Sequence, residues 1–176
     1  MTPDGSNLAN GYNKWLISDL VRDAFKYDGV VCTDWGITHD EGRTPEEFAG
    51  KPWGVETLTV AERHYTALMA GVDQFGGNNE MGPVLDAYRM MTAEHGEEFA
   101  RARLERSAVR LLKNIFRLGL FENPYLDPQE SGRVVGNPEF MQAGYEAQVK
   151  SVVMRKNKGS VLPVTDRKTV YIPRVY

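Results

Sequence analysis

Two short runs of strand-forming residues constrain the fold of this chain most. The first, Val30-Val31-Cys32-Thr33, has no polar alternation and leads directly into Asp34-Trp35-Gly36. A continuous apolar run is expected of a strand that is buried on both faces of a parallel sheet. A second run, residues 72–75 (VDQF), ends in the glycine-rich sequence GGNNE. Helical patterns precede both runs, so the order helix, strand, helix, strand predicts an α/β fold.

Apolar residues recur at helical spacing in the other parts of the chain. The pattern predicts helices over residues 12–26, 59–70, 83–93 and 97–118, and a last helix from residue 138 to about 154. Residues 36–56 contain four glycines and two prolines and therefore predict a long loop, which in a compact domain is often functional. The tail KTVYIPRVY predicts a final strand.

Composition argues against several classes of partner. The net charge of −3 arises from 21 basic and 24 acidic residues, without a basic run that could follow phosphates, so we expect no nucleic acid. No stretch approaches the roughly 18 apolar residues of a membrane span, and the first residues do not resemble an export signal. We therefore expect no membrane partner. Cys32 is the single cysteine, no Cys/His cluster has zinc spacing, and we expect neither a metal nor another cofactor.

Two parallel strands cannot cover their own edges. A closed sheet would need neighbouring strands that this sequence does not contain. We therefore expect the chain to be a piece of a larger fold, or to associate with itself through exposed sheet edges.

Asp34 and Trp35 are the first candidates for a functional site. A carboxylate just past the carboxyl end of a buried parallel strand lies where active sites collect in α/β barrels. A neighbouring indole offers a flat apolar surface to a sugar ring. The alternative is structural, because Asp before Gly is a common turn former and Trp is most often a core residue. The pattern alone leaves both interpretations open.

Four stretches resemble one family in the same order. The run NGYNKWLISDLVRDAFKYDGVVCTDWG resembles the nucleophile segment of glycoside hydrolase family 3, the β-glucosidase family. AGVD, residues 70–73, resembles its last barrel strand, and LGLFENPY, residues 118–125, resembles the end of its barrel domain. SVVMRKN, residues 151–157, with LPV at 162–164, resembles the lead into its second domain. Thr33, Tyr27 and Met154-Arg155 depart from the usual residues of these motifs.

The resemblance implies a fold and a domain division. Residues 1–122 would form the C-terminal portion of a (β/α)8 TIM barrel, and residues 123–160 a linker with a helix. Residues 161–176 would begin an α/β sandwich domain. The chain would then be an incomplete fragment of the family's architecture.

The resemblance also implies an activity, the retaining hydrolysis of terminal β-D-glucosides from oligosaccharides. Asp34 would be the catalytic nucleophile, and Trp35 would lie beside the terminal sugar. We add His39, from the loop after the nucleophile, and Asp73, at the end of the second run, as candidate substrate contacts. The general acid of the family would lie outside this chain, so we expect the fragment alone to be inactive. The resemblance leaves a β-xylosidase specificity open, and it leaves the cellular location unread, although relatives of this type are often secreted or periplasmic.

Several alternatives stay open. A local acid could come from His39, Asp40 or Glu41, although a solvated charged loop is the more ordinary interpretation. Asp73 could make structural hydrogen bonds instead of touching sugar. The whole chain could also be a noncatalytic module that binds a carbohydrate or a partner, in which case it would tolerate Asp34→Asn.

Overall fold

A computed structural model describes residues 5–40, 50–167 and 169–172 of the 176-residue chain. The chain divides into two compact units, Met1–Pro124 and Tyr125–Tyr176. Each unit is described by itself below. The predicted linker over residues 123–160 and the predicted domain from residue 161 onward stay predictions.

The structure overturns the predicted fold class. The described residues form helices and loops, with no β-strand among them, so the expected TIM barrel and α/β sandwich strand are wrong for this chain. The two strand-like runs meet only in an isolated parallel bridge between Cys32 and Gln74. A parallel ladder is stabilised by neighbouring strands on both sides. These runs have only each other, so the pairing does not extend into a sheet, and the sheet edges expected to drive self-association are not found in the described ranges.

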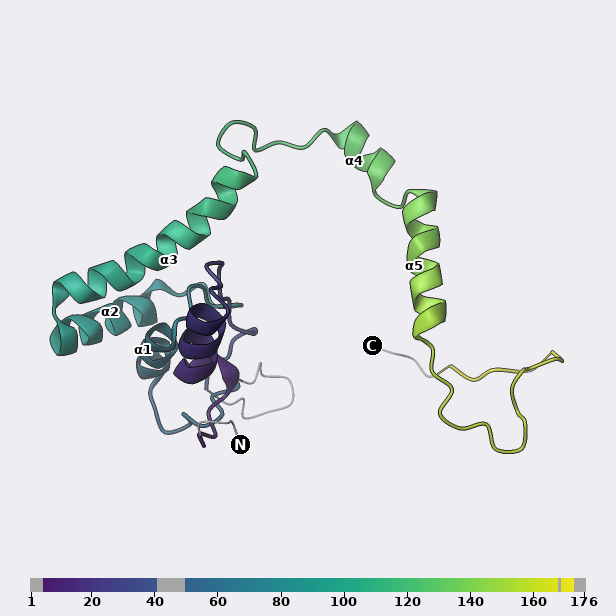
Figure 1. The fold of residues 1–176 in the computed structure, drawn as a ribbon, viewed down its shortest axis with the longest axis horizontal. Coiled ribbons are helices and arrows are strands. Elements are labelled where there is room, and N and C mark those ends of the chain that lie inside the picture. Colours follow the sequence, from purple (N-terminus) through teal and green to yellow (C-terminus); the bar gives the residue numbers. More distant parts are fainter. Residues whose placement is uncertain (1–4, 41–49, 168, 173–176) are drawn as a thin grey trace. The chain divides into compact units, whose positions relative to one another are not determined.

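Among the described residues of the first unit there are five helices (Figure 1). They are η1 (Asn10–Tyr12), η2 (Trp15–Ala24), α1 (Val60–Ala70), α2 (Met81–His95) and α3 (Glu97–Arg117). The predicted helices are confirmed to within a few residues at most ends. The first differs in kind, because η1 is a 3₁₀ turn and η2 a π-helix, in which the Phe25 N–H donates to the Leu20 carbonyl.

Local sequence explains where α1 begins and ends. The Thr59 side chain accepts the Glu62 N–H, and the Glu62 carboxylate accepts the Thr59 N–H, which together form a capping box. Gly71 follows the helix with φ 112°, a left-handed conformation that glycine adopts without a Cβ penalty. The turn at Gly71 delivers the chain directly into the second strand-like run.

Two apolar clusters hold the first unit together. One joins η1, η2 and α1 to the loops through Tyr12, Ile17, Ile37, Val55, Ala67, Ala70 and Val72. The other lies among α1, α2 and α3 and contains Leu68, Ala87, Met91 and Ala100. The three α-helices lie against one another in this order (Figure 1), and the first cluster places η2 beside the strand-like runs.

The second unit contains α4 (Pro128–Val134) and α5 (Pro138–Ser151). Both begin with a proline after a side-chain cap, since Asp127 accepts the Gln129 N–H and Asn137 accepts the Glu139 N–H. The predicted last helix is therefore confirmed from its first residue. No residue of either helix is buried, and the described residues after α5 form no regular element.

Candidate functional site

Asp34 lies at the bend that follows the first strand-like run, and hydrogen bonds to the second run fix this bend. The Thr33 N–H donates to the Gln74 carbonyl at 3.0 Å, and the Gly36 N–H donates to the Gly76 carbonyl at 2.8 Å. The Gly76 N–H in turn donates to Thr33 Oγ1 at 3.0 Å. The backbone on both sides of Asp34 is thus tied to residues 74–76.

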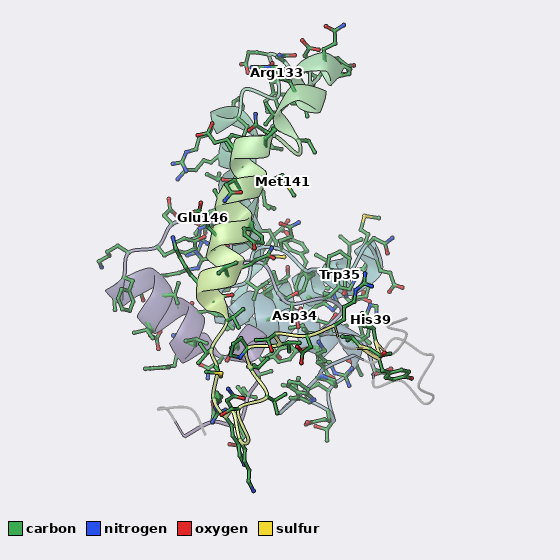
Figure 2. All side chains as sticks on the ribbon, turned by 90° about the vertical axis from the view of Figure 1, so that its right-hand side faces the viewer. Asp34, Trp35, His39, Arg133, Met141 and Glu146 are labelled. Atoms are coloured by element: carbon green, nitrogen blue, oxygen red, sulfur yellow. The ribbon has the colours of Figure 1, made fainter. Side chains whose placement is uncertain are left out.

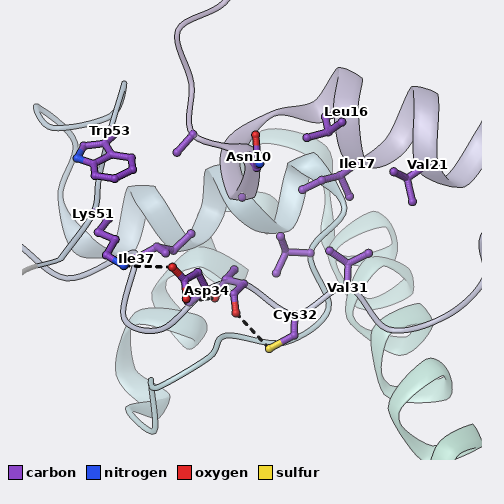
Figure 3. Close-up of a pocket in the computed structure, with 14 residues that line it drawn as sticks. Asn10, Leu16, Ile17, Val21, Val31, Cys32, Asp34, Ile37, Lys51 and Trp53 are labelled. Atoms are coloured by element: carbon purple, nitrogen blue, oxygen red, sulfur yellow. Dashed lines mark hydrogen bonds and ion pairs between the residues drawn. The ribbon is translucent and has the colours of Figure 1, made fainter. Parts of the chain in front are cut away.

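Both carboxylate oxygens of Asp34 have a hydrogen-bond donor. Oδ1 accepts the Trp35 N–H at 2.7 Å, and Oδ2 lies 3.1 Å from Lys51 Nζ (Figure 3). The Trp35 N–H first and the Lys51 ammonium second hold the pKa of the Asp34 carboxyl below its usual range. The side chain is 71% exposed. Asp34 is therefore an accessible, ionised carboxylate, which is the form that a nucleophile requires.

A cavity of about 530 Å³ opens beside Asp34. Its walls are mostly apolar side chains from η2 and from the first strand-like run, among them Leu16, Ile17 and Val31. Asp34, Lys51 and Trp53 supply the polar and aromatic groups on another side (Figure 3). A concave apolar site with a few converging polar groups is the usual form of a small-molecule site.

Trp35 is largely exposed, at 65%, as a surface that stacks against a ligand must be. Its indole lies against the backbone of Gly77, where an added Cβ would approach the ring atoms to 2.6 Å. The side chain does not line the cavity beside Asp34. Trp35 therefore offers an aromatic face next to the carboxylate but outside the cavity.

His39 lies in the turn that Asp34 begins, and its N–H donates to the Gly36 carbonyl at 3.1 Å. Asp34, Trp35 and His39 occupy the same part of the first unit (Figure 2). Asp40 forms an ion pair with the buried Arg63 at 2.7 Å, which ties it to α1. Glu41, the third candidate for a local acid, lies outside the described residues.

Asp73 is enclosed, with a side chain that has no exposed area. Oδ2 accepts from Arg22 and from the Val31 N–H, and Oδ1 accepts from Ser107 and from Arg110. Burial raises the pKa of this carboxyl, but these donors outweigh it and the net pKa is lowered, so Asp73 is ionised. Its contacts support the backbone three residues before Asp34 and link it to η2 and α3.

A second buried cluster lies beneath the turn after Asp34. Asn78 Nδ2 lies 2.6 Å from Thr38 Oγ1 and 3.3 Å from His64 Nε2. His64 Nδ1 lies 2.8 Å from the Val60 carbonyl, so this nitrogen carries the proton and Nε2 accepts. Burial lowers the pKa of His64. The neutral imidazole is a packing residue of the fold, far from solvent.

Lys51 and Trp53 are the site residues that sequence reasoning missed. They lie in GKPWG, residues 50–54, inside the long loop. The available signal was a cationic and an aromatic residue close together in the loop that follows the candidate nucleophile. Among residues 5–40, 50–167 and 169–172, no group of three or more His, Cys, Asp and Glu could hold a metal ion. In the same ranges no helix has the length and apolar character needed to cross a bilayer.

Curated relatives identify the family. No family model matches the chain. The periplasmic β-glucosidase/β-xylosidase of Dickeya chrysanthemi is 37% identical over 171 residues, 92% of this chain. The probable β-glucosidase C of Aspergillus flavus is 38% identical over 157 residues, 89% of the chain, and β-glucosidase C of Emericella nidulans is 34% identical over 165 residues, 92% of the chain.

The relatives are much longer than this chain. It spans 25%, 24% and 26% of their respective lengths, about a quarter in each case. The match nevertheless covers almost all of the chain, including the motif that carries Asp34 and Trp35. The chain belongs to glycoside hydrolase family 3, the family of these β-glucosidases.

Proposed function

We propose that this chain is part of a retaining β-glucosidase in which Asp34 is the nucleophile. The observation that carries the proposal is the state of this carboxylate, which is ionised, accessible and fixed beside a cavity. Relatives named β-glucosidase match the chain over about nine-tenths of its length. The family and the geometry therefore support the same residue.

The reaction would run in two displacements. One Asp34 oxygen attacks the anomeric carbon, the glycosidic C–O bond breaks, and the leaving oxygen takes a proton from a general acid. We place that acid outside this chain. Water then attacks the glycosyl ester, returns a proton to the same acid–base residue and frees Asp34, with net retention of configuration.

The other candidates take different roles. Trp35 would provide a platform for the sugar ring beside Asp34, and its exposed indole supports this role. His39 would contact the substrate from the same turn. For Asp73, the enclosed carboxylate and its partners support a positioning role through Val31 over a direct sugar contact.

The substrate would be a β-D-glucoside at the non-reducing end of an oligosaccharide. A β-xyloside is the alternative, because the name of the Dickeya relative joins the two activities. We expect the protein to be secreted or periplasmic, in agreement with the name of that relative. The chain alone is expected to turn over substrate weakly or not at all, because we place the general acid outside it.

A chimera provides the test. The 176 residues replace the matching segment of the Dickeya relative, and hydrolysis of an aryl β-glucoside and an aryl β-xyloside is measured. We expect activity that falls by about 1,000-fold or more with Asp34→Asn. The matched control Asp28→Asn, which removes an exposed carboxylate two residues before the first strand-like run, should keep the activity. An Asp34→Asn chimera that hydrolyses as fast as the parent would contradict the nucleophile role.

A noncatalytic carbohydrate- or partner-binding module is the second candidate. It would retain sugar binding in the Asp34→Asn chain, which titration with glucose or xylose would detect.

Self-association would rest on exposed apolar side chains such as Met141, Tyr145 and Val149 of α5 in place of sheet edges. Light scattering that rises with chain concentration would support it.

A further inference from the structure

In the long loop, the segment around Lys51, residues 50–54, is held in place on both sides. The Gly50 N–H donates to the Asp40 carbonyl at 2.9 Å, and an added Cβ at Gly50 would overlap the His39 carbonyl. Beyond Lys51, the Ala9 N–H donates to the Trp53 carbonyl at 2.9 Å. The backbone around Lys51 is therefore fixed one residue before it, at Gly50, and two residues after it, at Trp53.

The end of the same loop is tied to the interior. Gly54 has φ 88°, and its Cα lies so close to the chain at Asn7 and Leu8 that an added Cβ would approach the Asn7 carbonyl to 2.7 Å. The buried Arg63 donates to the carbonyls of Val55 at 3.2 Å and Glu56 at 2.9 Å. Because the backbone is held this closely, the direction in which the Lys51 side chain leaves it is fixed.

We propose that Lys51 is a positioning residue for the nucleophile, an inference that rests on the proposed function of Asp34. Its ammonium group holds Oδ2 (Figure 3), while the Trp35 N–H holds Oδ1, so the two bonds fix the rotation of the carboxylate at the wall of the cavity. Neither bond involves a proton transfer. A fixed carboxylate meets the anomeric carbon without a search over side-chain rotamers.

The contribution of Lys51 changes during the reaction. When an Asp34 oxygen forms the glycosyl ester, the carboxylate charge disappears and the attraction to Lys51 falls. When water releases the sugar, the charge returns beside the ammonium group, which favours Asp34 as a leaving group. Lys51 thus acts on the reaction through Asp34.

The chain contains a matched pair for the test. Asp28 Oδ2 lies 2.7 Å from Lys113 Nζ, so a second exposed carboxylate depends on a different lysine. Hydrogen bonds from Lys113 and then Arg110 lower the pKa of Asp28. Each lysine can be replaced by methionine, which keeps the length of the stem and removes the charge.

Carboxyl ¹³C NMR of the full chain, grown with labelled aspartate, measures both titrations. The resonances are assigned by their loss in Asp34→Asn and Asp28→Asn. We expect Lys51→Met to move the Asp34 midpoint to higher pH and leave Asp28 unchanged, and Lys113→Met to do the reverse. Lys51→Arg should restore the Asp34 midpoint, and 1 M salt should shrink the difference, because the Debye length there is about 3 Å.

An Asp34 midpoint that is the same in Lys51→Met and the parent would overturn the positioning role. So would an Asp34 shift of equal size in Lys113→Met, since it would reflect a general loss of charge. Covalent trapping with a fluorinated glucoside tests the nucleophile separately. If trapping fails but Lys51→Met still shifts the Asp34 midpoint, the proposed nucleophile is rejected and the Lys51–Asp34 contact stands. If trapping succeeds but the midpoint does not shift, only the positioning role of Lys51 is rejected.

Discussion

Replacing Asp73 by Asn should destabilise the first unit strongly. The substitution keeps the shape but removes the buried negative charge that pairs with Arg22, Arg103 and Arg110. One oxygen becomes an amide N–H₂ group, which must face either the donors Arg22 and Val31 N–H or the donors Ser107 and Arg110. Two donor contacts are therefore lost and buried arginine charge is left without its partner.

The size follows from the burial of the pair. Removing one partner of a buried ion pair costs about 3–5 kcal/mol, a large share of the roughly 5–15 kcal/mol that stabilises a typical domain. With a urea m-value of about 1–3 kcal/mol/M, the midpoint of unfolding should fall by about 1 M or more. The control Asp28→Asn removes an exposed carboxylate beside Arg110 and should leave the midpoint close to that of the parent.

Urea unfolding followed by tryptophan fluorescence and far-UV circular dichroism provides the assay. We expect a large loss of stability for Asp73→Asn and a small one for Asp28→Asn at the same pH and salt. Equal midpoints for the two variants, within about 0.3 M, would refute the claim that Asp73 holds the unit together. The variant should also perturb the NMR signal of Asp34, since Asp73 supports Val31.

Three further changes test the packing. Met91→Ala removes a fully buried side chain between α2 and α3 and should lower the free energy of unfolding by about 2–5 kcal/mol, while Met81→Ala, at an exposed site, should not change it measurably in the same urea series. Thr59→Ala removes the cap of α1 and should cost about 1 kcal/mol, which thermal unfolding with Thr57→Ala as control will show. Burial lowers the pKa of His64 in the folded state, so the unfolded chain binds the proton more readily. Stability should therefore be full above the usual histidine pKa of about 6.5 and fall as the pH drops below it. His64→Gln should remove this dependence in urea titrations across that range.

The helices could be predicted because their signals are local. Thr59 with Glu62 marks the start of α1, and Asn137-Pro138 marks the start of α5, within a few residues of chain in each case. Capping and periodicity are decided by neighbours in sequence, and tertiary context did not override them here.

The strands could not be predicted in the same way, because a strand needs partners that are distant in sequence. The run at Val31–Thr33 has the composition of a buried strand but finds only the residues around Gln74 to pair with. Composition reports what a segment can form in a full sheet. It does not report whether the remaining strands are present.

Only part of the site could be predicted, because some of its contacts join residues that are distant in sequence. The motif around Asp34 placed the carboxylate and its neighbour Trp35, which are adjacent in sequence. Lys51 reaches Asp34 across 17 positions of loop, and its contact depends on the anchoring of that loop. Arg103, Ser107 and Arg110 have helical spacing on one face of α3, a signal that an internal carboxylate such as Asp73 lies beneath them.

The most direct test of the central claim is covalent trapping of Asp34. The full chain and its Asp34→Asn variant are incubated with a 2,4-dinitrophenyl 2-deoxy-2-fluoro-β-glucoside, whose leaving group departs without protonation, so that no general acid is required. Peptide mapping by mass spectrometry then locates the label. We expect one fluoroglucosyl group on the peptide that carries Asp34, and none in the variant. A label on another carboxylate, or equal labelling of the variant, would contradict the assignment of Asp34 as the nucleophile.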